Sequence, residues 1–103
     1  MRMTPSTLEV AIALLEEPTA PHYGYEMSKR THLRSGVLYP ILQRMMNEGW
    51  LSDGWESPSP TDRPARRYYS VTPEGLSELG AMRSRAASDQ KLVRRYPEVA
   101  RYA

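Results

Sequence analysis

The stretch SGVLYPILQRMMNEG, residues 35–49, predicts the best-defined element of the chain. Its apolar residues recur at the spacing of one helical face, which is typical of a helix packed on a core; they are Val37, Leu38, Ile41, Leu42 and Met45. We expect Ser35 to cap the start of this helix and Gly49 to end it. The other face is polar, with Tyr39, Gln43, Arg44 and Asn47. This helix therefore has one face for a core and one for solvent or a partner.

Two further helices are predicted upstream. The first begins either at Thr4 with Pro5 or at the capping box of residues 6–9. An apolar stripe follows, and Pro18 ends the helix; the stripe is Leu8, Ala11, Ile12 and Leu15. Residues 24–31 form a second, shorter helix with Lys29 and Arg30 at its end, where cations suit the helix dipole.

Downstream, the pattern changes to that of a β-hairpin. Residues 50–55 and 67–71 are rich in residues that favour strands. The segment between them carries three prolines with Ser, Thr and Asp, and is expected to be a long hairpin tip. Thr72, Pro73 and Glu74 then begin a fourth helix, which we expect to continue until Pro97 interrupts it.

The order of three helices, a two-stranded hairpin and a long final helix is that of a winged helix-turn-helix. The predicted fold class is mainly α with a small β-hairpin (α+β). The chain has 103 residues, enough for one small domain. We expect a DNA-binding part over residues 1–75 and a C-terminal dimerisation helix and tail over residues 76–103.

Composition excludes several classes of protein. There is no cysteine, so disulfides and thiolate-ligated metals are excluded, and a reducing cytoplasm is the expected location. The longest apolar run, residues 10–15, is too short for a membrane span, so no membrane partner is expected. The scattered Ser residues and two His lie in no catalytic or phosphate-loop motif, so the chain is not expected to be an enzyme or to carry a cofactor.

The charge pattern favours a nucleic-acid partner. The net charge is only +2, but basic blocks at 22–49, 62–67 and 83–103 alternate with acidic ones. Twelve of the fourteen cations are arginine, which suits bidentate phosphate and base-edge contacts. A winged helix needs polar side chains on its third helix and cations in its hairpin, and both are present. The candidate contacts with double-stranded DNA are Lys29, Arg30, Arg34, Ser35, Tyr39, Gln43, Arg44, Arg63, Arg66 and Arg67.

Three sequence blocks together resemble the PadR family of bacterial transcriptional regulators. They are HYGYEM at residues 22–27, SGVLYPIL at 35–42 with EGWL at 48–51, and RRYYSVTPEG at 66–75. The resemblance implies a winged-helix homodimer that represses promoters at a pseudo-palindromic operator and is released by a small molecule. It makes Tyr39 the DNA-facing position and Leu38 a core position. Where the family usually has Thr, this chain has Val37, which can neither cap the helix nor reach a phosphate.

The resemblance also implies a short form of the family, with the final helix supplying much of the dimer contact and any effector pocket built at the dimer interface. The expected dimerisation residues are Leu8, Ile12, Leu76, Leu79, Met82, Ala86 and Val93. Trp50, Trp55 and Tyr96 either pack in the core or interface, or form a wall for a small aromatic effector.

Other hypotheses stay open at this point. Tyr39 can pack on the second helix instead of contacting DNA, and the wing arginines can belong to a merely solvated loop. A winged-helix module that binds an acidic protein has the same pattern of charges. His22 and His32 are the only imidazoles, and a metal-responsive repressor would need them at a bridged site, although their spacing matches no known ligand motif, so no metal site is expected.

Overall fold

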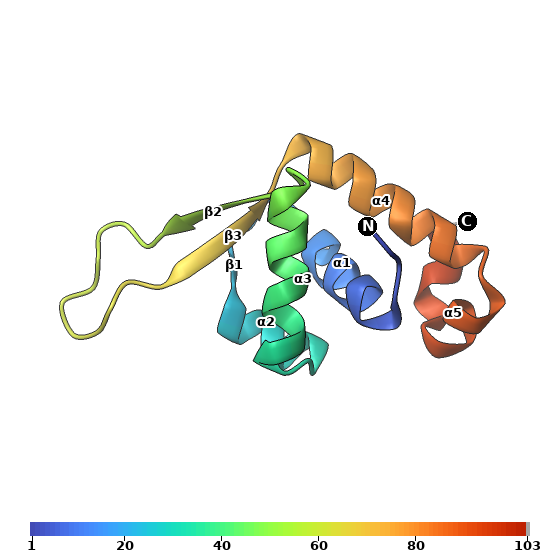
Figure 1. Cartoon of the computed structure of the whole chain (residues 1–103), viewed down its shortest axis with the longest axis horizontal. Coiled ribbons are helices and arrows are strands. Elements are labelled where there is room, and N and C mark those ends of the chain that lie inside the picture. The colour runs from blue at the N-terminus through green and yellow to red at the C-terminus, as the bar shows by residue number, and fades with distance from the viewer. Residues whose placement is uncertain (103) are drawn as a thin grey trace.

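The computed structural model describes residues 1–102 and confirms the predicted class, mainly helical with a small antiparallel sheet. The elements follow the chain in the order shown in Figure 1. They are α1 (Pro5–Glu16), β1 (His22–Tyr23), α2 (Gly24–Thr31), α3 (Ser35–Asn47), β2 (Leu51–Trp55), β3 (Arg67–Val71), α4 (Pro73–Ala87), α5 (Gln90–Arg95) and the 3-10 helix η1 (Pro97–Tyr102). The hairpin projects from one end of the helices and the C-terminal segment lies at the other, in a molecule 49 Å long.

The sheet has three strands, not the two that the sequence predicts. Its order is β1-β3-β2, and both pairs are antiparallel. β2 pairs with β3 from Leu51 opposite Val71 to Trp55 opposite Arg67. On the other side of β3, His22 lies opposite Tyr69. Two residues are too few to show a strand periodicity, so β1 was not detectable by pattern.

The ends of the helices follow the expected chemistry, with one correction. The Thr4 hydroxyl accepts a hydrogen bond from the Thr7 amide, so α1 begins with Thr4 and Pro5 and not with the Ser6 capping box. Ser35 is the first residue of α3 and not its cap; Arg34 holds that position without a side-chain cap. Gly49 does end the helix, with a φ of +80° that favours glycine.

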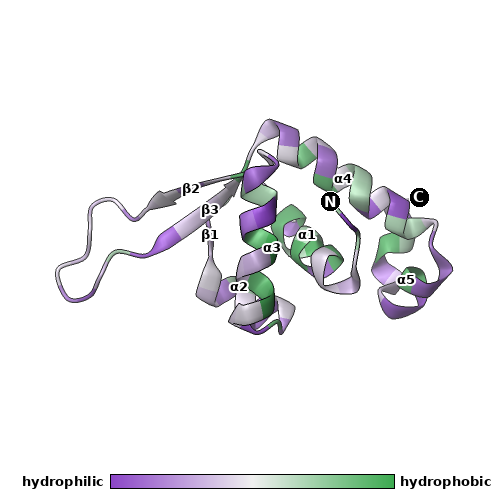
Figure 2. Cartoon of the chain, in the orientation of Figure 1, coloured by the Kyte–Doolittle hydropathy of each residue, from purple (hydrophilic) through white to green (hydrophobic). Residues whose placement is uncertain are grey.

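The core lies where α1, α3 and α4 meet the inner face of the sheet. Leu14, Leu38, Met45 and Leu79 are fully buried there. Figure 2 shows apolar residues on both α1 and α3, two helices that are in contact. Trp50, considered above as an effector wall, is 6% exposed and belongs to this core. Of the two roles considered for Trp50, this burial favours packing in the core.

The predicted long fourth helix is broken after Ala87. Asp89 accepts hydrogen bonds from the Lys91 and Leu92 amides, which begins a new helix, α5, in place of another turn of α4. The segment 88–102 then folds back toward α1, as Figure 1 shows. Its apolar residues form a second cluster with α1 and the end of α4; the cluster is Leu8, Ala86, Leu92, Tyr96 and Val99.

Burial within one chain changes the expected dimerisation stripe. Four of its residues have no exposed surface, so they stabilise the single chain and cannot contact a partner as the fold stands; they are Leu8, Leu79, Met82 and Ala86. Ile12 and Val93 are half-buried, and Leu76 is exposed. Within the predicted stripe, these three residues still offer apolar surface to a second copy.

Candidate nucleic-acid interface

The solvent face of α3 presents a row of polar side chains. Tyr39, Gln43 and Arg44 are exposed there, and Arg34 and Ser35 are exposed at the start of the helix. The Gln43 amide donates to the Asn47 side chain at 3.0 Å, which is a solvent-facing contact one turn along the helix. Leu38, Ile41 and Leu42 hold the opposite face in the core, so the polar row cannot rotate inward.

Tyr39 packs against the second helix and still exposes part of its ring. Its ring is 43% exposed, yet its hydroxyl lies against Gly24 at the start of α2. A Cβ atom on Gly24 would lie 2.2 Å from that hydroxyl, so only glycine leaves room for the ring. Tyr39 is therefore packed on α2 along one edge and open to solvent along the other.

The wing is defined as β2, β3 and the connecting residues 56–66. The carboxylate of Glu56 links the two ends of this connection. Glu56 accepts hydrogen bonds from Arg63 at 2.8 and 3.0 Å and from the Arg66 amide at 2.9 Å. The bond from Arg63 lowers the pKa of Glu56, and the same bond raises the pKa of Arg63. The Arg66 side chain approaches Glu56 only at 3.9 Å and is half exposed. Arg66 is thus the wing cation with the least neutralised charge.

Arg67 is held at the base of the wing by three groups. Its Nε donates to Asp53 Oδ2 at 2.7 Å, and its Nη2 lies 2.7 Å from the same oxygen and 3.4 Å from the sulfur of Met46 on α3. The guanidinium also lies 5.1 Å from the centre of the Tyr69 ring. Through these contacts, Arg67 connects α3 to the wing.

α3 and the base of the wing border a notch of about 280 Å³, which α2 closes on a third side. Its lining residues are Tyr23, Gly24, Tyr25, Tyr39, Arg66, Arg67 and Tyr69. The structure thus brings together three of the predicted DNA contacts, Tyr39, Arg66 and Arg67, from separate parts of the chain. Sequence reasoning missed Tyr25, which is 67% exposed, because it attributed the Gly-Tyr-Glu motif to structure alone.

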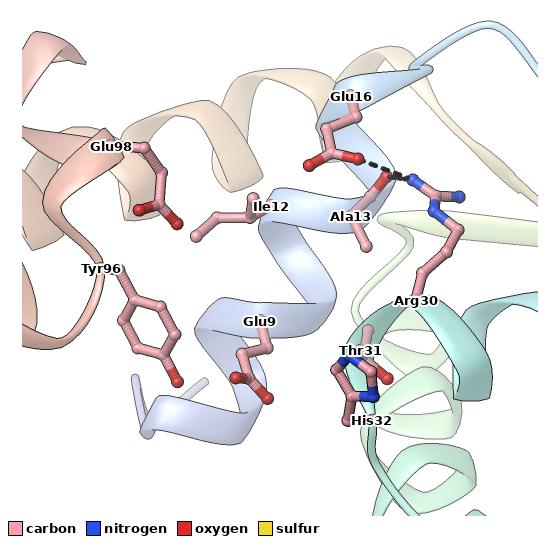
Figure 3. A pocket seen from close by; sticks show the side chains of 9 residues that line it. All are labelled: Glu9, Ile12, Ala13, Glu16, Arg30, Thr31, His32, Tyr96 and Glu98. Atoms are coloured by element: carbon pink, nitrogen blue, oxygen red, sulfur yellow. Dashed lines mark hydrogen bonds and ion pairs between the residues drawn. The ribbon is translucent and has the colours of Figure 1, made fainter.

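On α2, the structure separates the two predicted cations. Lys29 lies 4.8 Å from the ring centre of Tyr25, beside the notch. Arg30 instead turns toward α1, where its Nη2 donates to the Ala13 carbonyl at 2.5 Å and to Glu16 at 3.2 Å (Figure 3). The donors of Arg30 thus satisfy groups at the end of α1, away from the notch.

His22 joins the same structural network. It is buried, its Nε2 is hydrogen-bonded to the Glu17 carbonyl at 2.8 Å, and its Nδ1 lies 3.4 Å from Arg30. Nε2 therefore carries the proton, and Nδ1 accepts. Burial lowers the pKa of His22, and the charge of Arg30 lowers it further against the raising effect of the Glu17 carbonyl. Both ring nitrogens are engaged, which leaves neither free for a metal.

The residues considered for an effector lie in different places. Trp55 is 61% exposed and borders a groove of about 480 Å³ on the outer side of the sheet, together with Tyr23 and Tyr68. Tyr96 borders a cavity of about 180 Å³ between α1, the end of α2 and the C-terminal segment (Figure 3). Burial raises the pKa of the Tyr96 phenol.

Over residues 1–102, no group of three or more His, Cys, Asp or Glu side chains is placed to hold a metal ion. Within the same range, no helix is long and apolar enough to cross a membrane.

A three-helix unit whose third helix has an exposed polar face, followed by an arginine-bearing hairpin, defines a winged helix-turn-helix protein. The chain belongs to the PadR-like family of transcriptional regulators, whose family model matches residues 12–81. It is accordingly a DNA-binding regulator of transcription.

Solved structures agree with this assignment. A PadR-like transcription factor from Bacteroides fragilis is 28% identical with a TM-score of 0.65, over 89% of this chain and 91% of that one. A PadR-like regulator from Bacillus cereus is 25% identical with a TM-score of 0.63, over 84% and 88% of the two chains. A PadR family regulator from Clostridium difficile shares the fold, with 23% identity, a TM-score of 0.66, and coverage of 86% and 96%. No match was found among curated protein sequences.

Proposed function

We propose that the protein is a homodimeric repressor that binds a pseudo-palindromic operator and is released by a small molecule. The observation that carries the DNA-binding geometry is the shared notch, which joins the polar face of α3 to the base of the wing. α3 enters the major groove, and the wing follows the neighbouring phosphate backbone.

The exposed side chains divide into two kinds of contact. Tyr39, Gln43 and Arg44 on α3 are near enough to one another to meet base edges or adjacent phosphates. Lys29, Arg34, Ser35, Arg63, Arg66 and Arg67 supply phosphate contacts from α2, the start of α3 and the wing. Arg63 must exchange Glu56 for a phosphate to take part, because its bidentate pair is formed in the free protein.

The dimer forms mainly through residues 76–103, with a contribution from α1; Ala103 lies outside the described residues. Exposed Leu76 and half-buried Val93 and Ile12 supply its apolar surface. Two-fold symmetry then places two α3 helices about one turn of DNA apart, roughly 34 Å.

An aromatic effector has two candidate positions. Trp55 on the wing groove offers a flat aromatic wall, and Tyr96 borders the cavity beside α1 and α2. Both lie close to elements that position α3 or the wing, so occupancy of either can change DNA affinity.

The test is titration of duplex DNA from the region upstream of the gene, against a scrambled duplex of equal length. The wild type should prefer the upstream duplex, and Tyr39→Ala should lose that preference while sedimentation still shows a dimer. If Tyr39→Ala weakens both duplexes equally, Tyr39 reads no bases. If neither duplex binds at low salt, the winged-helix module that binds an acidic protein replaces this proposal.

A further inference from the structure

We propose that the notch between α3 and the wing seats one DNA phosphate and that Asp53, an acid, strengthens DNA binding by positioning Arg67 for it. This inference rests on the proposed function. From its charge alone, Asp53 would be expected to weaken DNA binding, whereas here it strengthens it. Asp53 is a positioning residue, since it acts through Arg67 and does not itself contact the DNA.

The chemistry of the notch suits a phosphate. The described residues that line it carry two guanidinium groups and four phenol rings, and no carboxylate. Guanidinium groups bind phosphate oxygens through charge-assisted, often bidentate bonds, and phenol hydroxyls can donate to the same oxygens. Tyr25 and Tyr39 are both substantially exposed at this point, so an incoming backbone can reach them.

The geometry of Arg67 shows why Asp53 matters. Asp53 Oδ2 lies 2.7 Å from both Nε and Nη2 of Arg67, the Met46 sulfur also contacts Nη2, and the Tyr69 ring lies beside the guanidinium. Among the described residues, Nη1 of Arg67 has no hydrogen-bond partner, so its donors are free for a phosphate oxygen. An arginine held in place loses less side-chain entropy on binding than one that moves freely.

The other wing pair differs in a way that isolates this role. Glu56 takes both Nη1 and Nη2 of Arg63, which are the donors that a phosphate would use. Asp53 engages Nε and Nη2 of Arg67 and leaves Nη1. Glu56 therefore competes with phosphate for Arg63, whereas Asp53 orients Arg67 toward it.

The two possible roles of Asp53 predict effects of opposite sign. If Asp53 were only a negative charge near the DNA, its removal would tighten binding. If it positions Arg67, Asp53→Asn weakens binding although the protein becomes more positive. The matched control is Asp62→Asn, which removes an exposed acid of the same wing for which the structure shows no ion pair.

The experiment measures the Kd for one duplex by fluorescence anisotropy over a range of salt. We expect Asp53→Asn and Arg67→Gln each to weaken binding about tenfold, the loss of one charge-assisted contact, and the double variant to be no weaker than Arg67→Gln alone. Both should lower the slope of log Kd against log salt by about 0.9 per protomer. Asp53→Glu should recover most of the affinity, and Asp62→Asn should bind as the wild type or slightly more tightly.

An Asp53→Asn variant that binds as tightly as the wild type, or more tightly, overturns the positioning role. Additive losses in the double variant also overturn it, because Asp53 would then act independently of Arg67. Thermal unfolding of each variant shows whether the fold is intact, which is expected because both side chains are partly exposed. Failure of the wild type to bind any duplex contradicts the proposed function instead, so the two failures are distinguishable.

Discussion

Substitution of Gly24 by alanine moves Tyr39 without removing any side chain. A Cβ atom at position 24 would lie 2.2 Å from the Tyr39 hydroxyl, 2.8 Å from Cζ and 3.0 Å from Cε1. Ordinary contact begins near 3.4 Å, so the end of the ring must shift by about 1 Å. The ring is the exposed end of a side chain and can swing outward, whereas the backbone of α2 can stay in place.

The expected result is a loss of DNA affinity with little loss of stability. Alanine at the first position of α2 lowers the conformational entropy of the unfolded chain and so stabilises the folded protein by about 0.4–1 kcal/mol. This gain offsets part of the cost of moving the ring. We therefore expect the free energy of unfolding to change by less than about 1 kcal/mol. A misplaced Tyr39 loses about one hydrogen bond to DNA, or about tenfold in Kd.

The assay is fluorescence anisotropy on one duplex, with urea unfolding of the same proteins. Gly80→Ala is the matched control, because a Cβ at that position of α4 meets nothing within 4 Å. In a Tyr39→Ala background, Gly24→Ala should have no further effect, since there is no ring to displace. An equal loss in both backgrounds would refute the reasoning, and so would full affinity in Gly24→Ala itself.

The other predictions concern stability. Gly75→Ala places a Cβ 1.9 Å from the Trp50 carbonyl oxygen, a backbone atom, and should destabilise by about 1–3 kcal/mol or more in urea unfolding, whereas Gly80→Ala should stabilise by about 0.5–1 kcal/mol. Arg30→Met should lower the free energy of unfolding by about 1–2 kcal/mol and leave the Kd for DNA unchanged; a change in Kd alone would return Arg30 to the interface. The lowered pKa of His22 predicts that stability decreases as pH falls below about 6.5, because the unfolded chain then takes up a proton that the folded chain resists. The contribution of His22 to the slope cannot exceed about 1.4 kcal/mol per pH unit, the limit for one proton, and should be lost in His22→Gln; an unchanged slope in that variant counts against the assignment.

The order of elements could be predicted from local signals. α3 carries a helical periodicity, the hairpin strands are rich in residues that favour strands, and Thr4, Thr72 and Gly49 mark boundaries by side-chain or backbone chemistry. β1 and the direction of α5 depend on contacts distant in sequence, although the start of α5 has a local signal in the Asp89 cap. β1 exists because its two residues pair with β3, and α5 turns back because its apolar residues find α1.

The sequence predicts which residue types form the candidate site, but not which of its arginines form ion pairs. The wing arginines and Tyr39 follow from the order of elements, but ion pairing decides which cations are free. Arg30 is a residue type that commonly contacts DNA, but its guanidinium is hydrogen-bonded to α1, and Arg63 is paired with Glu56. Asp53 has no local signal at all, since its role depends on a partner fourteen residues away across the sheet.

The central claim, that α3 and the wing bind the DNA backbone together, is tested most directly by the dependence of Kd on salt for the wild-type protein. A dimer with about 6–10 phosphate contacts should lose on the order of a thousandfold or more in affinity between 50 and 200 mM salt. A Kd that stays constant over that range would contradict the claim.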